Sequence, residues 1–476
     1  MDKLNILSQS TAIILILSLS VLFVIIGILY SKKYLGLNNY LVASRSIGTS
    51  SLTASLVASA LGAWILFGPA SAATWGGIGA VIGYALGTAF PLFALIYLGT
   101  KLRKLYPKCR TLIEIIRFRF GKKLFKLVMF LSIFYMTIFL IAEVTAVSML
   151  IKYISGTDLW ITALVVILSS LIYTLYGGLR ASIITDNIQF VLFIILIIIS
   201  FIYMISFNLN EFSFAYIKSN KPNLISSSYI PNFTAGLTFF IAVAATNLFH
   251  QGNWQRVYAA KSNKVLINSL LLSFLIIIPI VFFMGFSGLI AVSENKDVVA
   301  DLAFFSLLLK KELLVLSIVL VILAISLTIS SIDTLINAIS SLIIVDGKNV
   351  FKFNGNYLKI SKYIIIILSL ISFYFASKGL SILYLFLLAD LFCCSAVLTI
   401  FFSFYSKRIN SKNAYVSIIV GLIAGILLFP MPDFTKSILV GVILPTELFH
   451  TFFANNLLFL SFIIATFAPI ITFRFK

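Results

Sequence analysis

Histidine, cysteine and acidic residues are scarce in this chain. Its 476 residues include two histidines, His250 and His450, three cysteines, and 15 Asp and Glu residues. No metal-ligand spacing exists among them, which excludes a zinc site. Cys393 and Cys394 are adjacent in an apolar segment and cannot bridge each other, while Cys109 lies in a basic loop. With no nucleophile elbow and no paired catalytic carboxylates on one span, the sequence is not that of an enzyme, and no cofactor is expected.

Long polar stretches are also few. Hydrophobic residues make up 61% of the chain, and the mean hydropathy is +1.12. This composition excludes an ordinary soluble protein and predicts an all-α membrane protein, with residues 1–476 forming a single transmembrane domain. About thirteen apolar spans are expected, near 10–30, 50–74, 77–100, 125–151, 158–176, 182–206, 233–251, 265–292, 313–345, 359–376, 380–404, 413–430 and 453–473.

The basic residues are distributed unevenly along the chain. There are 35 Lys and Arg residues, and the formal net charge is +20. If the N-terminus is outside, about three quarters of them fall in loops on the inner side. These inner residues are Lys32, Lys33, Arg45, those of 101–126, Arg180, Arg256, Lys261, Lys264, those of 348–362, Lys407, Arg408, Lys412, Arg474 and Lys476. The asymmetry predicts a multi-pass protein of the cell (plasma or inner) membrane with a cytoplasmic C-terminus, in contact with anionic lipids rather than nucleic acid.

Four acidic residues fall within or at the ends of the expected spans: Glu143, Asp186, Asp333 and Asp390. No Lys or Arg is expected inside any span. An isolated embedded acid can be protonated and hydrogen-bonded, and for Asp390 that alternative and a functional role stay equally open. Because a carboxylate in hydrocarbon costs at least about 2.5 kcal/mol, such residues usually serve a function. Four acids without a basic partner indicate that mobile cations complete the charge balance.

A polar stripe marks the ninth span, within SLTISSIDTLINAISS. Positions 327, 330, 331 and 334 follow the i, i+3, i+4, i+7 spacing and therefore share one helix face. Asp333 borders this face at i+3 from Ser330. Hydroxyl and carboxylate oxygens without a fixed counter-charge suit a small hard cation that has lost its water. The stripe therefore predicts a cation pathway.

Two spans contain helix-weakening residues in mid-membrane. The second includes Gly62, Gly68 and Pro69, and the seventh begins near Pro231 and Gly236 and ends in the polar run Thr246, Asn247, His250 and Gln251. Broken spans in corresponding positions of two halves are typical of a transporter built from inverted repeats. Close helix packing at the glycines is the alternative. Repeat 1 is expected at about 50–206 and repeat 2 at about 233–404, with peripheral helices 10–30, 413–430 and 453–473.

Four segments together resemble the sodium:solute symporter family. They are NNYLVASRSIG before the first core helix, YTLYGGLRASIITDNIQ around the fifth, NWQRVYAAKS after the sixth and SSIDTLINAISSLIIVD in the eighth. Their joint order covers roughly residues 10–405. The resemblance implies the leucine-transporter-type five-plus-five inverted repeat with discontinuous helices, and uptake driven by a sodium gradient.

The resemblance also implies ion-binding residues. Its principal sodium site matches the carbonyls of Ala58, Leu61 and Leu327 and the hydroxyls of Ser330 and Ser331. The alternative for the two serines is back-bonding to carbonyls one turn earlier. A second sodium position in some members matches Asp186, Ser330, Asp333 and Thr334. The competing role for Asp186 is an inner gate, paired with Arg180 or Arg256.

The substrate site is expected between the broken spans. Its candidate residues are Ala60, Gly62, Trp64, Glu143, Thr246, Asn247 and His250. Trp64 can equally be a packing aromatic. Glu143 is the most distinctive, because a carboxylate favours a solute with N–H donors or a positive charge, such as an amino acid, urea or an amine.

Sodium-coupled uptake of a small polar organic solute by alternating access is therefore the predicted function, with Na⁺ as the coupling ion and only metal. The partners are the solute, Na⁺ and membrane lipids, while the oligomeric state stays open. A proton-coupled symporter of the same fold is the alternative. An ion channel is disfavoured, because the chain contains neither a repeated pore loop nor a subunit-sized number of spans.

Overall fold

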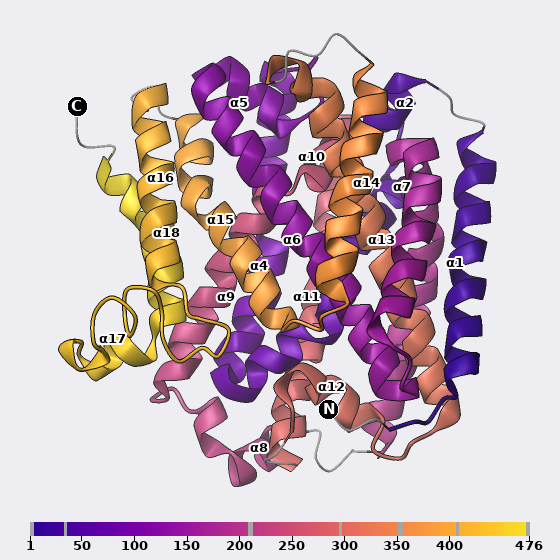
Figure 1. Cartoon of the computed structure of the whole chain (residues 1–476), viewed down its shortest axis with the longest axis vertical. Coiled ribbons are helices and arrows are strands. Elements are labelled where there is room, and N and C mark those ends of the chain that lie inside the picture. The colour runs from indigo at the N-terminus through magenta and orange to yellow at the C-terminus, as the bar shows by residue number, and fades with distance from the viewer. Residues whose placement is uncertain are drawn as a thin grey trace.

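The computed structural model describes residues 4–32, 36–207, 213–294, 298–350, 356–405 and 409–472. Within these residues the protein is helical, with isolated β-bridges in place of strands (Figure 1). The basic residues Lys33, Lys352, Lys407, Arg408, Arg474 and Lys476, and the last residue of the expected span 453–473, lie outside the described residues. The all-α membrane fold expected from the composition is confirmed.

The helices of the first half surround two breaks in the helical structure. In chain order the elements are α1 (Gln9–Ser31), α2 (Leu37–Val42), η1 (Ala43–Arg45), α3 (Thr49–Ala60), η2 (Ala63–Leu66), α4 (Gly68–Leu105), α5 (Leu112–Phe120), α6 (Lys122–Ser155), α7 (Leu159–Phe207), α8 (Phe214–Asn220), η3 (Pro222–Ile225), α9 (Ile230–Phe249) and α10 (Gln251–Ala259).

The second half follows after the second break. They are α11 (Asn263–Glu294), η4 (Ala300–Leu302), α12 (Ala303–Leu308), α13 (Leu314–Asp346), η5 (Gly347–Asn349), α14 (Tyr357–Ala376), α15 (Ile382–Ser403), α16 (Ser411–Leu428), η6 (Thr446–Leu448), α17 (Thr451–Asn455) and α18 (Leu457–Thr472).

Ten helices of the described chain are long and apolar enough to cross a membrane, so the expected count of thirteen is not confirmed. Two long helices account for part of the difference. A straight helix of the 49 residues of α7 would be about 73 Å long, more than twice the hydrocarbon thickness of a bilayer. Gly178, at φ +59° and ψ −150°, interrupts it between the expected spans 158–176 and 182–206. Gly77, at φ +59°, interrupts α4 in the same way.

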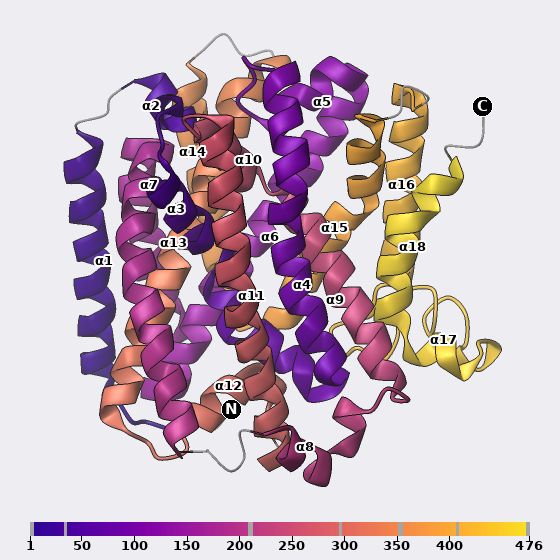
Figure 2. The same ribbon diagram turned by 180° about the vertical axis from the view of Figure 1, so that it is seen from behind.

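The two ends of the molecule differ in their loops. In both views α2, α5 and α10 lie toward one end, while α8, α12 and α17 lie toward the other (Figures 1 and 2). The dense basic segment 101–126 lies at the first end, where it forms the end of α4, the helix α5 and the start of α6. The charge asymmetry of the sequence therefore has a counterpart in the structure.

Apolar side chains cover the outside of the bundle. On α1, Ile14 and Leu29 are 64% and 56% exposed, and on α14 Leu370 is 62% exposed. In contrast, α13 and α15 are largely buried, and their interior faces carry serine, threonine and aspartate residues. Such an apolar exterior around a polar interior is what a protein surrounded by lipid needs. The centre of the bundle, along α13, is where function is expected.

Backbone hydrogen bonds join the ends of α3 and α10. The N–H of Ile47, just before α3, donates to the carbonyl of Ala259 at 3.1 Å, and the N–H of Lys261 donates to the carbonyl of Ile47 at 2.9 Å. This short parallel bridge connects segments more than 200 residues apart in sequence. Helix α3, which precedes the first break, and helix α10, which follows the second, are thus attached to each other.

Close packing of α4 on α9 and α11 gives a test of the fold. A Cβ atom at Gly79 would lie 1.7 Å from the carbonyl oxygen of Asn232, whereas one at Gly347 would have only ordinary contacts of 3.5 Å or more. We expect Gly79→Ala to destabilise the protein by about 1–3 kcal/mol through overpacking, and Gly347→Ala to be tolerated. Thermal unfolding of the purified variants in detergent measures this. Equal melting temperatures for the two would contradict the packing described here.

Candidate substrate cavity and buried ion pair

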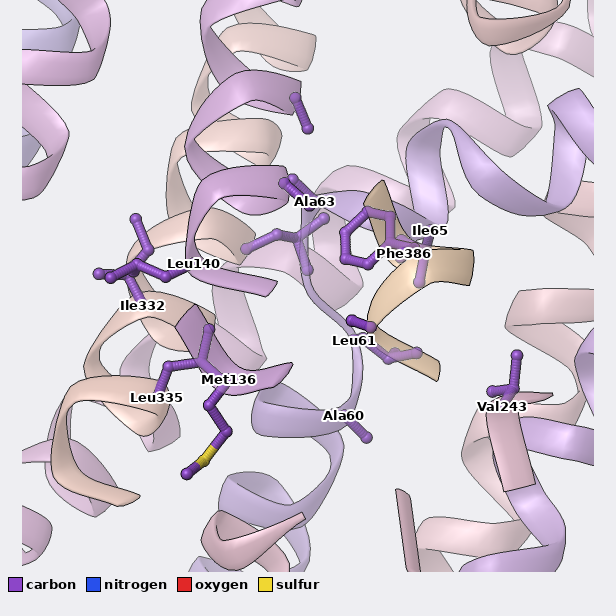
Figure 3. Close-up of a cluster of buried hydrophobic side chains, with 14 of the residues drawn as sticks. Ala60, Leu61, Ala63, Ile65, Met136, Leu140, Val243, Ile332, Leu335 and Phe386 are labelled. Atoms are coloured by element: carbon purple, nitrogen blue, oxygen red, sulfur yellow. The ribbon is translucent and has the colours of Figure 1, made fainter. Parts of the chain in front are cut away.

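The first break separates α3 from α4. The helix α3 ends at Ala60, and Leu61 has the non-helical angles φ −100° and ψ 87°. Helix α4 begins only at Gly68, with Pro69 at its start, where proline's missing N–H costs nothing. Figure 3 shows Ala60, Leu61 and Ala63 along this break, with Phe386 beside it. Because a helix end leaves its last carbonyls without helical partners, Ala58, in the last turn of α3, and Leu61 are placed to offer oxygen atoms.

The second break separates α9 from α10. His250 lies between them in an extended conformation, at φ −60° and ψ 111°, and its Nδ1 accepts a hydrogen bond from the N–H of Gly252 at 3.1 Å. Every residue of α10 is buried. The polar run at the end of the seventh expected span is therefore a helix break, and the chain continues into the protein interior instead of leaving it.

A cavity lies between the two breaks, with an empty volume of about 550 Å³ that includes its open mouth. The expected residues Ala60, Trp64, Glu143, Thr246, Asn247 and His250 all line it, together with Ser331 from the proposed sodium site; the other lining residues are Ser59, Tyr84, Phe139, Val243, Leu335, Phe386 and Asp390. Gly62 is not among the lining residues. No Lys or Arg lines the cavity.

Glu143 on α6 contacts the first break directly. Its Oε2 accepts a hydrogen bond from the N–H of Ala63 at 2.9 Å. A Cβ atom at Gly62 would lie 2.1 Å from Glu143 Oε1 and 2.5 Å from Ser331 Oγ. Only glycine therefore lets the unwound backbone, the carboxyl group and the serine hydroxyl meet at this point.

Asp390 on α15 contacts the end of α9. Its Oδ1 accepts a hydrogen bond from the hydroxyl of Thr246 at 2.6 Å. The side chain is 96% buried, yet it lines the cavity. The embedded acid whose role the sequence left open thus belongs to the same cavity as Glu143.

A buried ion pair lies beside the cavity. Arg256 Nη2 is 2.7 Å from Asp186 Oδ2, and both side chains are 0% exposed. The hydroxyl of Ser55 bridges the pair, donating to Asp186 at 2.5 Å and accepting from Arg256 Nε at 2.7 Å. Ser330 donates to Asp186 Oδ1 at 2.6 Å, and Thr334 accepts from Arg256 at 3.0 Å.

The pair corrects two expectations. Arg256 was expected in a cytoplasmic loop, and the four embedded acids were expected to have no basic partner; instead Arg256 lies buried in α10 and neutralises Asp186. The reason is the second break, which returns the chain to the interior as a helix. Of the two candidate partners, Arg256 makes the contact, while Arg180 donates to the hydroxyl of Ser46 and the carbonyl of Ala43.

Asp333 is held by hydroxyl groups. Tyr173 donates to Oδ2 at 2.6 Å and Ser182 donates to Oδ1 at 2.9 Å, with Thr185 and Thr334 at 3.3 and 3.4 Å. No Lys or Arg makes a salt bridge with it in the described part of the chain. Asp333 is therefore a buried carboxyl group whose direct partners are hydroxyl groups.

The residues expected at the principal sodium site differ in their contacts. Ser331 lies against Gly62 at the first break. Ser330 donates its proton to Asp186 and not to a carbonyl one turn earlier, which leaves its lone pairs as possible ligands. Leu327 is fully buried on α13, one turn before Ser331. The structure brings Ser331, Ala58 and Leu61 to one break and connects Ser330 to the ion pair.

Sequence reasoning missed Ser55, Phe139, Phe386 and Tyr84. Ser55 gives no signal, because serines are frequent throughout the spans. Phe139 and Phe386 each precede an embedded acid by four residues, a helical spacing that places them on the acid's face. Tyr84 stacks on Trp64 with ring centroids 5.8 Å apart, so Trp64 both packs and lines the cavity.

The ion pair predicts a large loss of stability when one partner is removed. Asp186→Asn or Arg256→Gln should each cost about 3–5 kcal/mol, because each leaves a buried charge uncompensated. Glu294→Gln is the matched control, since it breaks a pair whose Lys310 is 58% exposed and should cost about 0–1 kcal/mol. Chemical unfolding in detergent measures the difference. Losses of similar size in all three variants would contradict the buried pair.

Comparison with known proteins supplies the family. The family model of the sodium:solute symporter family matches residues 40–421. The chain is 27% identical over 288 residues to the spermidine transporter DUR31 of Candida albicans, a match covering 60% of this chain and 54% of that protein. It is 24% identical over 170 residues to the urea active transporter of Saccharomyces cerevisiae, covering 36% of this chain and 23% of that one. The matches thus span about half the length, or less, of these relatives.

Solved structures agree in fold. A Na⁺-coupled sialic acid symporter, in a substrate-bound outward-open state, superposes with a TM-score of 0.72 at 19% identity, covering 97% of this chain and 98% of that one. Mhp1, a nucleobase-cation-symport-1 family transporter, superposes with a TM-score of 0.57 at 14% identity, covering 92% and 95%. These likenesses show the leucine-transporter-type fold with discontinuous helices. Together with the family match over most of its length, they make the chain a multi-pass membrane protein of the sodium:solute symporter family.

Proposed function

We propose that this protein couples the entry of sodium to the uptake of a small amine-bearing organic solute by alternating access. One observation carries the proposal: Ser331 contacts the break at Gly62 and also lines the cavity that holds Glu143. The ion site and the solute cavity then share a wall. An ion bound at that wall holds α3 against α13 and shapes the cavity for the solute, so each ligand favours the binding of the other.

The sodium ion is assigned to five oxygen atoms at the junction of α3 and α13. The carbonyls of Ala58, Leu61 and Leu327 and the hydroxyls of Ser330 and Ser331 provide them. Unwound backbone can be tolerated in a membrane where it lines a cavity, and its free carbonyls replace the water that a sodium ion loses. No cofactor is assigned; sodium acts only as the coupling ion.

Alternating access requires one closed end at a time. The ion pair of Asp186 and Arg256 joins α7 to α10 near the end that carries the basic segment 101–126. By the positive-inside rule that end is cytoplasmic, which places the N-terminus outside and the C-terminus inside the cell membrane. We assign the pair to an inner gate that opens after sodium and solute have bound.

The lining of the cavity selects the class of solute. Glu143 and Asp390 supply buried carboxyl groups, and no Lys or Arg lines the same space. A solute carrying N–H donors or positive charge satisfies these groups, whereas an anion would meet unfavourable charge. Relatives named for spermidine and urea are consistent with a nitrogen-rich solute.

Proton coupling is the second candidate function. The observation in its favour is the burial of the Asp333 carboxyl group among hydroxyl groups. A buried carboxyl group with hydroxyl partners can carry either a proton or, with Thr334 and Asp186, a second sodium ion. Uptake measured with and without sodium at fixed pH separates the two couplings. A flux ratio of one sodium ion per solute would exclude the second ion.

Replacing Ser331 tests the sodium assignment. We expect Ser331→Ala to raise the sodium concentration for half-maximal uptake by about tenfold, because a ligand oxygen lost from a desolvated ion is worth about 1.5–3 kcal/mol. Uptake is measured in proteoliposomes with an imposed sodium gradient.

The matched control is Ser326→Ala on the same helix. Ser326 is buried and donates to the carbonyl of Ile322 one turn earlier, so its loss should leave the sodium requirement unchanged. An unchanged requirement in Ser331→Ala, or an equal change in both variants, would refute the ligand assignment.

A further inference from the structure

Two helices that line the cavity run antiparallel. On α6 and α15, Phe134 pairs with Phe392 at a ring-centroid distance of 4.8 Å, and Phe139 pairs with Phe386 at 5.1 Å. As residue numbers rise along α6, those of the facing residues fall along α15. The aromatic pairs therefore define which positions of the two helices lie at the same level.

This register places the two cavity acids at different levels. Glu143 follows Phe139 by one turn in one direction, and Asp390 follows Phe386 by one turn in the opposite direction. Asp390 faces the level of position 135 or 136 on α6, so the Cα atoms of the two acids are separated by about 11 Å along the helix axes, at 1.5 Å per residue. The hydrogen bonds of the two acids also place them at different levels, because Glu143 contacts the first break at Ala63 and Asp390 contacts Thr246 near the second.

Aromatic rings occupy the space between the acids. Phe139 and Phe386 are in contact at the level between them, and both line the cavity together with Trp64 and Tyr84. Aromatic faces accept methylene groups and also attract cations. The cavity thus has a carboxyl group toward each end and an apolar middle.

Neither acid has a basic partner in the described ranges, where the salt bridges join Arg256 with Asp186 and Lys310 with Glu294. Glu143 accepts a hydrogen bond from the N–H of Ala63, Asp390 accepts one from the hydroxyl of Thr246, and both carboxyl groups line the cavity. A solute with a single positive charge can balance only one of them and leaves the other buried without a counter-charge.

We propose that the cavity binds a linear aliphatic di- or polyamine end to end, with one ammonium group at Glu143, another at Asp390, and the methylene chain against the aromatic rings. The inference rests on the proposed transport function and specifies its substrate class. Spacing decides among amines: a chain that spans both levels neutralises both carboxylates, and a shorter one does not.

The test compares amines of different length and charge on the purified full-length protein. Binding of spermidine, putrescine and butylamine is measured by thermal shift at fixed high sodium. We expect spermidine to bind tightest and butylamine weakest. Glu143→Gln and Asp390→Asn should each weaken spermidine by about tenfold or more, while butylamine loses affinity in only one of the two variants, because it reaches one carboxylate.

Glu294→Gln is the matched control, since it removes a carboxylate outside the cavity and should leave every amine unaffected. A sodium-dependent thermal shift retained in each variant shows that it is folded. If a variant does not fold, the order of affinities of the three amines for the unaltered protein still tests the inference.

The inference would be overturned if butylamine bound as tightly as spermidine, or if both cavity variants bound spermidine normally. Sodium-dependent binding of a neutral solute in preference to every amine would also refute it, while leaving sodium-coupled transport intact. If sodium enhanced the binding of no solute, the proposed function itself would fail.

Discussion

The buried ion pair of Asp186 and Arg256 is the constraint on which the interior depends. It joins α7 to α10, and through Ser55 and Ser330 it reaches α3 and α13. A carboxylate and a guanidinium at 0% exposure are stable only when each satisfies the other and the remaining hydrogen bonds are made. Four segments of the two halves of the chain must therefore be in place at once for this pair to exist.

In the part of the chain that the structure describes, the other buried charged side chains are acidic and form no salt bridge. Glu143 and Asp390 line the cavity, and Asp333 is surrounded by hydroxyl groups. In a protein surrounded by lipid, keeping these carboxyl groups ionised without a counter-charge is energetically costly. The arrangement therefore separates a fixed cation, Arg256, from buried carboxyl groups that mobile cations would balance under the proposed function.

Much of this was accessible from the sequence. Hydropathy predicted a helical membrane protein, Gly62 and Pro69 predicted the first break, and six of the seven expected cavity residues line the cavity. The partner of Asp186 could not be assigned, because Arg256 follows a polar run that reads equally as a loop or as an unwound segment. The number of spans is not confirmed, because α7 is one long helical segment that Gly178 divides between the two expected spans 158–176 and 182–206, and a count of continuous helices takes it once. The spacing of the two cavity acids depends on the pairing of α6 with α15, which is a tertiary contact without a local signal.

The bridge between Ile47 and the segment after Arg256 has a mechanical consequence. Two backbone hydrogen bonds and the ion pair network fasten the short inner pieces of both interrupted helices to each other. A rotation that displaces one piece must carry its companion, with the non-helical backbone at Leu61 and His250 as the points where each helix is interrupted. The two interruptions are therefore coupled mechanically, and in the transport cycle proposed above they would bend together and not independently.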